Sequence, residues 1–573
     1  MIDKMNSNHS TTVETIQAGD LFSRTYSVPL YQREYAWGRE EIQQLLDDFQ
    51  DSFESDKSRY YHIGSLTAFV RVDASGRRSY ELIDGQQRTI TLALLLRLLS
   101  GVMPAGAPTF RLLERLRFEN RPDAESFLAT FDERPNDPPA MPATFRRAVD
   151  AMLDHPVFGE EFRGRLSEFA EFVRSHVVLF LVIMPSETDV SAYFEIMNNR
   201  GLQLEYHELL KAKLIAKLPN DTDKILFDKL WTACSRMDGR LEDRLDKETI
   251  HAIADGKPWL QLDGKAVTFN ETPNEEGVSR SIIPDFPNFL LHVLRFCMKT
   301  MQRQDSADAV PLDERQMRKA FDDRMDDIKP GHFLDMLLRM RLRFDRFVIK
   351  AEGDSCGGEI RWRIEGCDDW SQGDRERLTH LQAMLQVSYP SRRHKEWLSR
   401  LLCADKLENA QELINLLEEF AKEKVCERGS VDSIRGMGTD TPHIVLNLID
   451  YLMYCANPEK YSGSASFRFA YRNSVEHHFP QGSEDDDWTK KAINDIGNLY
   501  LLAKSDNSSL NVRGPEQKAK LVGKLDNLPP KRREMYQLTL SEGWTPGVMR
   551  RHSNAVLKLL EWFQVNHLIK DNN

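Results

Sequence analysis

The sequence predicts a mostly helical α+β protein, and three observations lead to this fold class. The first 220 residues alternate short apolar strands with helices, whereas the next section contains one amphipathic helix after another. Near the carboxyl terminus the order strand, loop, strand, helix returns. We therefore divide the chain into an α+β domain over 1–220, a helical connector over 221–430 and a second strand-containing domain over 431–573. A length of 573 residues accommodates three domains of ordinary size.

Composition and charge exclude several classes of protein. With 41% hydrophobic and 29% charged residues, the chain is neither collagenous nor of low complexity nor wholly disordered. The seven cysteines include no CxxC pair, which argues against a disulfide framework or a thiolate zinc site and indicates a reducing cytoplasm. The amino terminus lacks the apolar stretch of a signal peptide, and no window reaches the roughly 18 apolar residues of a membrane span. We therefore expect a cytoplasmic protein without a membrane segment.

The elements of the first domain follow from hydrophobic periodicity. Apolar residues at helical spacing predict an amphipathic helix over 38–49. Two strand-like runs, 60–72 and 79–83, predict a hairpin that leads through Asp-Gly into an apolar helix over 86–99. A stretch rich in Pro, Asp and Asn over 119–142 is expected to form a surface excursion. A buried strand is expected over 177–184 and a helix over 189–204.

The rest of the chain is predicted to be helical until its last hundred residues. Three of the amphipathic helices expected in the connector span 333–344, 377–386 and 407–423. The strand-like segments 467–481 and 495–511 then precede a helix-like segment over 516–525. Basic residues outnumber acidic residues in 461–573 although the whole chain carries a net charge of −12, so the excess of positive charge lies in this part.

A polar cluster at 84–88 stands where a predicted strand turns into a predicted helix. Asp-Gly followed by two glutamines and an arginine would direct free backbone N–H groups and a guanidinium toward an anion such as a phosphate. The alternative is structural: Asp84 caps the helix, and Arg88 pairs with Glu81 or Glu34. No GxxxxGK[ST] motif occurs, so any nucleotide hydrolysis here would not use a P-loop.

Four motifs in order resemble the amino-terminal domain of GmrSD-type restriction proteins. They are VPLYQREYAW (28–37), IGSLTAF (63–69), ELIDGQQRTITLALLL (81–96) and YFEIMNNRGLQLEYHELLKAKLI (193–215). The resemblance implies a ParB/sulfiredoxin-like fold that binds and hydrolyses GTP or ATP and, in several relatives, senses modified DNA. It places Asp84 and Arg88 at the catalytic centre of hydrolysis. The nucleotide-binding residues that it implies are Gln32, Arg33, Asp84, Gln86, Gln87, Arg88, Asn199 and Arg200.

A second constellation near the carboxyl terminus has the spacing of a metal-dependent nuclease. Glu476-His477 is followed by Pro480, then by Gly497-Asn498, Ser505-Asp506-Asn507 and Lys518. Phosphodiester hydrolysis needs a base that deprotonates water and a divalent cation that stabilises charge on the phosphate. A histidine beside an acidic ligand, facing an asparagine across a hairpin, supplies both. Carboxylate and amide oxygens suit Mg²⁺ or Mn²⁺.

This segment resembles the His-Me finger (HNH) nuclease domain, a ββα-metal fold, which forms the carboxy-terminal half of GmrSD-type proteins. The resemblance makes His477 the general base and Asn498 the residue that orients it. It also makes Glu476 and Asn507 metal ligands and Lys518 a contact to the DNA phosphate. Two alternatives stay open, because His478 stands beside His477 and Asn511 follows Asn507, although the distance to Pro480 favours His477.

The two resemblances together predict an NTP-regulated endonuclease that nicks or cleaves double-stranded DNA in phage defence. They imply type IV restriction, which acts on modified DNA or is licensed by it. The alternative is an NTP-switched regulator that binds DNA or protein and carries an inactive nuclease-like domain. The doubled histidine and the acidic run over 484–487 motivate that alternative. The sequence leaves homo-oligomerisation open.

Overall fold

In the computed structural model the chain forms two compact units. Unit 1 comprises Met1–Ala233 with Leu262–Pro273, and unit 2 comprises Cys234–Gln261 with Asn274–Asn573. The division into 1–220, 221–430 and 431–573 stays a prediction. The structure describes residues 11–29, 32, 35–72, 76–102, 115–119, 122–133, 143–185, 206–237, 239–262, 280–281, 285–301, 309–352, 361–366, 370–391, 395–404, 409–461, 467–481, 488–503, 513–521 and 525–565.

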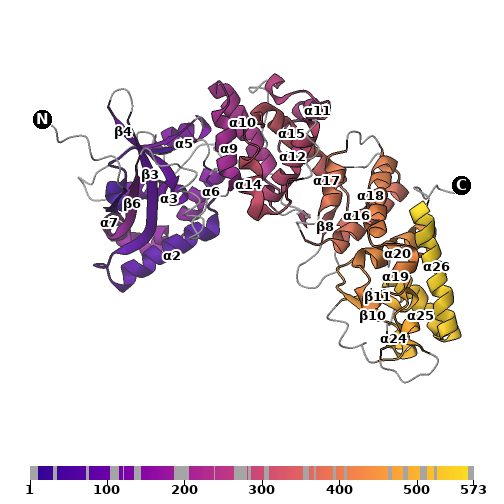
Figure 1. Ribbon diagram of the computed structural model, residues 1–573. Helices are drawn as coiled ribbons and strands as arrows, with labels where there is room; N and C mark the ends of the chain where they lie inside the picture. The colour runs from indigo at the N-terminus through magenta and orange to yellow at the C-terminus, as the bar shows by residue number, and fades with distance from the viewer. Residues whose placement is uncertain are drawn as a thin grey trace. The chain divides into compact units, whose positions relative to one another are not determined.

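A six-stranded mixed sheet with the order β1-β6-β3-β4-β2-β5 forms the centre of unit 1. Its strands are β1 (Thr12–Gln17), β2 (Tyr26–Val28), β3 (Tyr61–Val72), β4 (Arg78–Asp84), β5 (Leu116–Phe118) and β6 (Val177–Met184) (Figure 1). β3 and β4 form the predicted antiparallel hairpin, whereas β3 and β6 run parallel. The strands predicted over 60–72, 79–83 and 177–184 are therefore confirmed.

Helices cover this sheet and bury its apolar side chains. α3 (Gln86–Leu99) is buried along almost its whole surface, because apolar residues occupy every side of it. α2 (Arg39–Ser55) buries the predicted stripe that includes Ile42, Leu46 and Phe49. The helices predicted over 38–49 and 86–99 are thus confirmed. The other α-helices described in this unit are α1 (Ala18–Leu21), α5 (Pro122–Glu133), α6 (Ala143–Leu153), α7 (Leu166–His176), α9 (Tyr206–Ala216) and α10 (Asp221–Ser235), the last of which ends in unit 2.

The excursion predicted over 119–142 contains a helix, so that prediction is wrong for its first half. In α5, Phe127 and Phe131 are fully buried, and Phe127 stacks on Phe145 with ring centroids 5.0 Å apart. The polar residues of the segment concealed this apolar face from the sequence. Pro122 suits the first position of the helix, because proline's missing N–H has no intrahelical partner there. The helix predicted over 189–204 lies outside the described residues.

Unit 2 begins as a series of packed helices. Three of them, α15 (Pro330–Phe347), α16 (Gln372–Ser388) and α18 (Ala410–Cys426), confirm the helices predicted in the connector. The others are α11 (Lys247–Ala254), α12 (Phe286–Thr300), α14 (Met317–Asp322), α17 (Glu396–Leu402), α19 (Val431–Arg435), α20 (His443–Ala456) and α21 (Pro458–Tyr461). α16 packs against both α18 and α20 (Figure 1). A small sheet joins β7 (Arg280–Ser281), β8 (Lys350–Glu352) and β9 (Arg361–Arg363).

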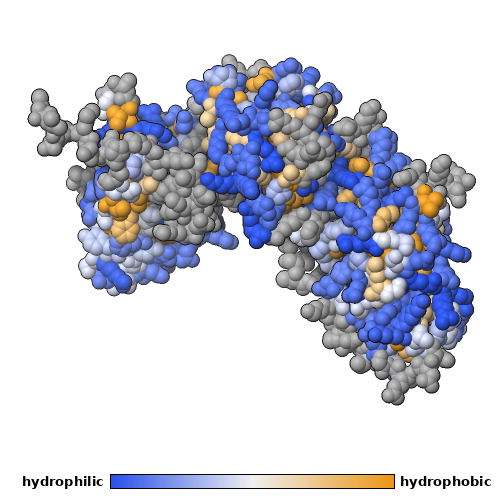
Figure 2. Space-filling view, in the orientation of Figure 1, coloured by the Kyte–Doolittle hydropathy of each residue, from blue (hydrophilic) through white to orange (hydrophobic). Residues whose placement is uncertain are grey.

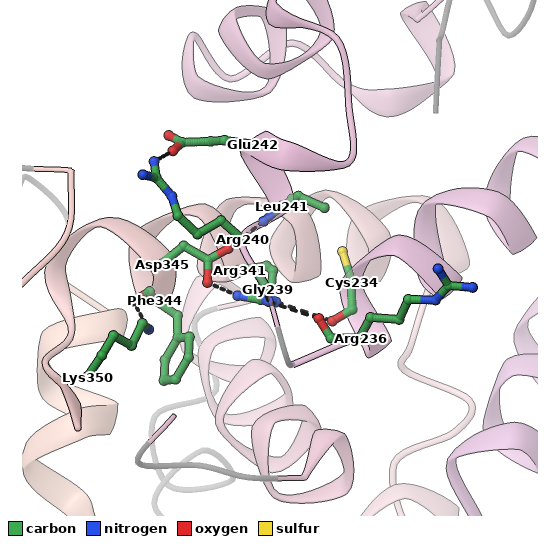
Figure 3. Close-up of polar contacts among 10 residues, drawn as sticks. All are labelled: Cys234, Arg236, Gly239, Arg240, Leu241, Glu242, Arg341, Phe344, Asp345 and Lys350. Atoms are coloured by element: carbon green, nitrogen blue, oxygen red, sulfur yellow. Dashed lines mark hydrogen bonds and ion pairs between the residues drawn. The ribbon is translucent and has the colours of Figure 1, made fainter. Parts of the chain in front are cut away.

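A buried arginine fastens the start of unit 2 to α15 (Figure 3). The Arg341 guanidinium is fully buried and forms an ion pair with Asp345 one turn along the helix. It also donates to three backbone carbonyls, those of Cys234, Arg236 and Gly239. The second Asp345 oxygen accepts the Leu241 N–H at 2.8 Å. Because these backbone groups are satisfied by a paired, buried charge, loss of either partner would leave an uncompensated charge in the core.

The last part of unit 2 has the predicted order strand, strand, helix. Its elements are β10 (Ser474–His477), α22 (Lys490–Ile493), β11 (Leu499–Leu502), α24 (Pro515–Leu521), α25 (Pro530–Glu542) and α26 (Pro546–Val565). A separate apolar cluster packs β11 against α25 and the start of α26 through Tyr500, Leu502, Met535, Tyr536 and Met549. The mostly helical α+β fold class is therefore confirmed.

The surface of the chain is mainly hydrophilic, with small separate hydrophobic patches on the face seen in Figure 2. Among the residues that the structure describes, no helix is long and apolar enough to span a membrane.

Candidate active site

The β10–β11 hairpin brings the carboxy-terminal motifs together. The two strands are antiparallel, and Glu476 lies opposite Tyr500 while His477 lies opposite Leu499. His477 ends β10 and is only 7% exposed. Glu476, one residue earlier, is half-buried and accepts a hydrogen bond from the Ser474 hydroxyl at 2.9 Å. A largely buried imidazole therefore stands beside a carboxylate that solvent reaches.

Two amide side chains hold the His477 ring. Its Nε2 lies 3.0 Å from the Asn494 Oδ1, and the Gln481 Nε2 lies 3.3 Å from the same ring nitrogen. Gln481 also donates to the Asn494 Oδ1 at 3.2 Å. The shorter contact, to the Asn494 oxygen, favours the tautomer with the proton on Nε2, and the Gln481 amide then donates to Asn494 instead of to the ring. This tautomer leaves the Nδ1 lone pair for a proton from water. Sequence reasoning missed Asn494, whose only signal was an amide residue four positions before Asn498.

The environment of His477 keeps its imidazole neutral at physiological pH. Burial lowers the pKa of His477 below its ordinary value, and the nearby Lys518 ammonium lowers it further. The hydrogen bond to Asn494 and the Glu476 carboxylate oppose this shift. A neutral histidine with a free ring nitrogen is the state that a general base requires.

Asn498 acts on the backbone next to the histidine and not on the ring. Its Oδ1 accepts the Phe479 N–H at 2.8 Å and the Trp544 Nε1–H at 3.2 Å. Its Nδ2 donates to the carbonyls of Phe479 and Ile493 at 3.1 and 2.9 Å. These four contacts fasten the turn that follows β10. Asn498 therefore holds the chain beside His477, whereas Asn494 touches the imidazole itself, and the orienting role of Asn498 stays a prediction.

Lys518 lies beneath the strand end and not on the surface. The side chain is almost fully buried, and its ammonium donates to the carbonyls of His477 and His478 at 2.5 and 3.1 Å. Burial lowers the pKa of Lys518 to about 8. Because both carbonyls belong to the histidine pair, this geometry makes Lys518 a positioning residue. The predicted contact of Lys518 with a DNA phosphate stays a prediction. The position of the ammonium does not support it, because the ammonium points to two backbone carbonyls.

The neighbouring His478 belongs to the core. It is fully buried, stacks on Tyr536 with ring centroids 5.2 Å apart, and meets Trp544 edge to face. Its Nε2 lies 2.7 Å from the Thr539 hydroxyl. Burial holds the pKa of His478 far below its ordinary value. Since no solvent reaches this ring, the structure favours His477 over His478 as the base.

The hairpin offers part of a site for a hard divalent cation. Glu476 supplies a carboxylate oxygen at its solvent-reached edge, and oxygen ligands of this kind suit Mg²⁺ or Mn²⁺. The second predicted ligand, Asn507, and its alternative, Asn511, lie outside the described residues. No group of three or more His, Cys, Asp or Glu side chains that could hold a metal occurs in the part of the chain that the structure describes. The Glu476 carboxylate is a suitable ligand for such a cation. The other predicted metal ligands stay predictions.

The amino-terminal cluster lies at the junction of β4 and α3. The Arg88 Nη2 lies 3.5 Å from the Asp84 Oδ2, and its Nη1 donates to the Ile63 carbonyl at 3.2 Å. Gly64 has a φ of +111°, and a Cβ at this position would lie 2.1 Å from Arg88 Nη1, so only glycine leaves room for the guanidinium. Gly85, not Asp84, is the N-cap of α3. Arg88 therefore pairs within the cluster rather than with Glu81.

Two of the predicted nucleotide-binding amides hold backbone in this corner. Gln32 is 4% exposed and donates to the Ile83 carbonyl at 2.7 Å, immediately before Asp84. The Gln87 Oε1 accepts the N–H groups of Ala36 and Trp37 at 2.8 and 3.3 Å. The structure thus gathers Gln32, Asp84, Gln86, Gln87 and Arg88 at one junction. Arg33, Asn199 and Arg200 lie outside the described residues.

Comparison with known protein families supplies the class of protein that these two sites define. The class is that of the restriction endonucleases, in which DNA is the substrate. A model of the GmrSD restriction endonuclease amino-terminal domain matches residues 16–215, and a model of the GmrSD carboxy-terminal domain matches residues 435–559. Together they cover more than half of the chain, which therefore belongs to the GmrSD restriction endonucleases. The comparison with curated proteins found no match.

Proposed function

We propose that this protein is a metal-dependent endodeoxyribonuclease of phage defence whose activity depends on a nucleoside triphosphate. The observation that carries the nuclease is the largely buried His477 ring, held by Asn494 beside the Glu476 carboxylate. In this proposal the hairpin with α24 is the core of a His-Me finger fold, and the sheet of unit 1 is a ParB/sulfiredoxin-like NTPase domain. The protein acts in the cytoplasm, where the five free cysteines of the described residues stay reduced.

The proposed cleavage uses the ring as a base. The His477 Nδ1 takes a proton from a water molecule, which then attacks the scissile phosphate, while Asn494 keeps the opposite ring nitrogen protonated. Lys518 and Asn498 hold the strand end so that the ring stays in place. Glu476 and Asn507 would hold Mg²⁺ or Mn²⁺, which supplies charge stabilisation at the phosphate and the leaving oxygen.

Metal binding is tested by thermal stabilisation. A ligand that binds only the folded state raises the melting temperature, so excess Mn²⁺ should stabilise the wild type. Glu476→Ala should lose this stabilisation and also the cleavage of plasmid DNA. Glu516→Ala, on the exposed start of α24, is the matched control and should keep both. An equal response to Mn²⁺ in wild type and Glu476→Ala would remove the carboxylate from the metal site.

The proposed nucleotide site is the corner where β4 meets α3. The Arg88 guanidinium at the amino end of α3 would bind the phosphates of GTP or ATP, and Asp84 would serve hydrolysis. Bound nucleotide would then shift the equilibrium between a resting and a cutting form, which requires different affinities for the two. Modified DNA would be the substrate or the licensing signal.

This regulation is separable from the nuclease by experiment. Cleavage of a plasmid and binding of a labelled duplex should both be measured with and without GTP or ATP, on modified and unmodified DNA. The proposal predicts a change in cleavage rate or in DNA affinity when the nucleotide is added. If neither quantity changes, the regulatory part is wrong even if the protein cuts DNA.

A further inference from the structure

A groove in unit 2 lies beside the path of the chain into the nuclease hairpin. It has a volume of about 600 Å³ and is formed by β9, α16, the end of α20 and the segment 467–469. α16 and α20, which form two of its sides, pack against each other (Figure 1). We call it the arginine–aromatic groove, after its principal lining residues: Trp362, Arg363, Arg375, His380, Phe467 and Arg468.

The groove is positively charged. Three guanidiniums line it, those of Arg363, Arg375 and Arg468, together with the carboxylate of Glu376. Arg363 also pairs with the Glu365 carboxylate at 2.7 Å, so the guanidiniums still outnumber the carboxylates by one. His380 adds no charge near neutral pH, because burial, reinforced by Arg468, lowers the pKa of His380 to about 4. The positive charge therefore comes from arginines, which stay charged at every physiological pH. Guanidiniums bind phosphate oxygens through paired hydrogen bonds.

One wall of the groove is aromatic and fixed in orientation. The Trp362 Nε1–H donates to the Phe469 carbonyl at 2.7 Å, which holds the half-buried indole in place. Phe467 stacks on His380 with ring centroids 6.1 Å apart, and both rings belong to the lining of the groove. Tyr471 meets Trp362 edge to face and is 42% exposed. A planar nucleic-acid base can stack on such rings, whereas an extended acidic peptide has no planar base to stack on them.

The groove is close in sequence to the catalytic histidine. Phe469 precedes His477 by eight residues, and a chain of this length spans at most about 29 Å when fully extended. At roughly 3.4 Å per nucleotide step, that limit corresponds to about eight nucleotides. A DNA strand cut at the hairpin is therefore long enough to enter the groove.

We propose that the arginine–aromatic groove binds a nucleotide of the DNA strand that the hairpin cuts, with its phosphate on the arginines and its unstacked base against Trp362. This inference rests on the proposed function. An unpaired or extruded base is required, because the faces of paired bases are covered in a duplex. Single-stranded DNA should thus depend on the groove more than duplex DNA does.

The test measures DNA binding without cleavage. The full-length protein in EDTA is titrated against a fluorescein-labelled 20-nucleotide single strand and the matching duplex, by anisotropy, at several salt concentrations. Arg363→Gln and Arg468→Gln should each weaken single-strand binding about 3- to 10-fold at 150 mM salt and reduce the slope of log K against log salt by about 0.7. Trp362→Leu should weaken it about fivefold or more without changing the slope.

Arg400→Gln is the matched control, because Arg400 pairs with Glu423 on an exposed face of the same unit. It should bind DNA like the wild type. Arg363 is exposed, so its variant keeps the fold, and melting curves check all four proteins. Wild-type affinity and slope in the groove variants would overturn the inference. Loss of binding to a fluorescent GTP or ATP analogue, with DNA binding unchanged, would also overturn it and assign the groove to a free nucleotide. If the protein binds DNA through the groove but never cuts it, the proposed function fails and the groove assignment stands.

Discussion

At the scale of residues, the hydrogen bond between His477 and Asn494 organises the candidate nuclease site. Removing it in Asn494→Ala should release the ring from its productive orientation, and we expect the cleavage rate to fall by up to about 100-fold. Because this hydrogen bond raises the pKa of His477, the acid limb of the pH–rate profile should move to lower pH in the alanine variant. Asn494→Asp places a negative charge beside the ring, which raises the pKa of His477, and should move the acid limb to higher pH.

Single-turnover cleavage between pH 5 and pH 8 measures both effects. Asn527→Ala, on the short helix at Leu525–Asn527, provides an asparagine control outside the site. An unchanged rate and an unchanged acid limb in both Asn494 variants would show that the ring is positioned by other groups.

Asp84 gives a second prediction at this scale. Asp84→Ala should abolish NTP hydrolysis while leaving the fold intact, because its described ion pair is a 3.5 Å contact to Arg88. Phosphate release and the melting temperature are the two measurements, with Asp154→Ala, which loses a surface pair with Arg39, as the control. Full turnover in Asp84→Ala would remove this carboxylate from the site.

The sequence gives the order of these candidate residues along the chain but not their contacts. Glu476, His477 and Asn498 were found because motif residues keep a fixed order along the chain. Whether an ammonium or an amide faces solvent depends on the packing around it, which motif spacing does not encode. Lys518 shows this difference, since its buried ammonium holds two carbonyls although its position in the motif indicated a phosphate.

At the scale of elements, the candidate site depends on how α26 packs against the short helix Ile496–Asn498. A Cβ on Gly497 would lie 2.7 Å from the Ser553 Cβ and 2.9 Å from the Met549 carbonyl oxygen. Gly497→Ala should therefore push α26 away and destabilise unit 2 by about 1–3 kcal/mol, the usual cost of overpacking. Cleavage should fall with it, because Asn498 follows directly.

Chemical unfolding and cleavage assays measure these two effects. Gly436→Ala is the control, because a Cβ there meets no atom within 4 Å. A Gly497→Ala protein as stable and active as the control would mean that the helix accommodates the methyl group.

Elements with a strong hydrophobic period could be predicted, and elements with a weak one could not. β6 is an uninterrupted apolar run and α3 is apolar through most of its length, and their predicted bounds agree with the structure. α5 was missed because prolines, aspartates and asparagines on both sides suggested a loop, although Phe127 and Phe131 give it a buried face. The local composition reflects the polar residues of this segment and does not reveal the buried face of the helix.

At the scale of the whole molecule, buried histidines predict sensitivity to acid. Burial lowers the pKa of His292 to about 3 and that of His380 to about 4, both below the ordinary value of 6.5. The unfolded chain therefore binds more protons below pH 6.5, and stability falls as the pH drops. Each group contributes about 1.4 kcal/mol per pH unit between its two pKa values.

Melting temperatures between pH 7.5 and pH 5 test this prediction. His292→Asn, which keeps a polar atom near the Ser399 hydroxyl, should show a smaller loss on acidification than the wild type. His251→Asn, on the exposed side of α11, should show the full loss. A wild-type melting temperature that rises toward pH 5 would contradict the predicted loss of stability in acid.

The presence of two sites in one chain could be predicted from the sequence only through its resemblance to a known family. Hydrophobic periodicity predicted the helices, and each motif was read separately along the chain. The contact between His477 and Asn494 joins residues 17 positions apart through a hairpin turn, and nothing in the local pattern specifies that distance. Only the packed hairpin shows that the His477 ring is buried and held by an amide side chain.

The most direct test of the central claim is the nicking of supercoiled plasmid DNA by the wild type, His477→Ala and the control His251→Ala. The assay uses Mg²⁺ or Mn²⁺, with and without GTP or ATP, on modified and unmodified DNA. The account predicts cleavage by the wild type and the control, and a loss of about 100-fold or more in His477→Ala, the usual contribution of a general base. Equal cleavage by all three proteins, or no cleavage under any condition, would contradict it.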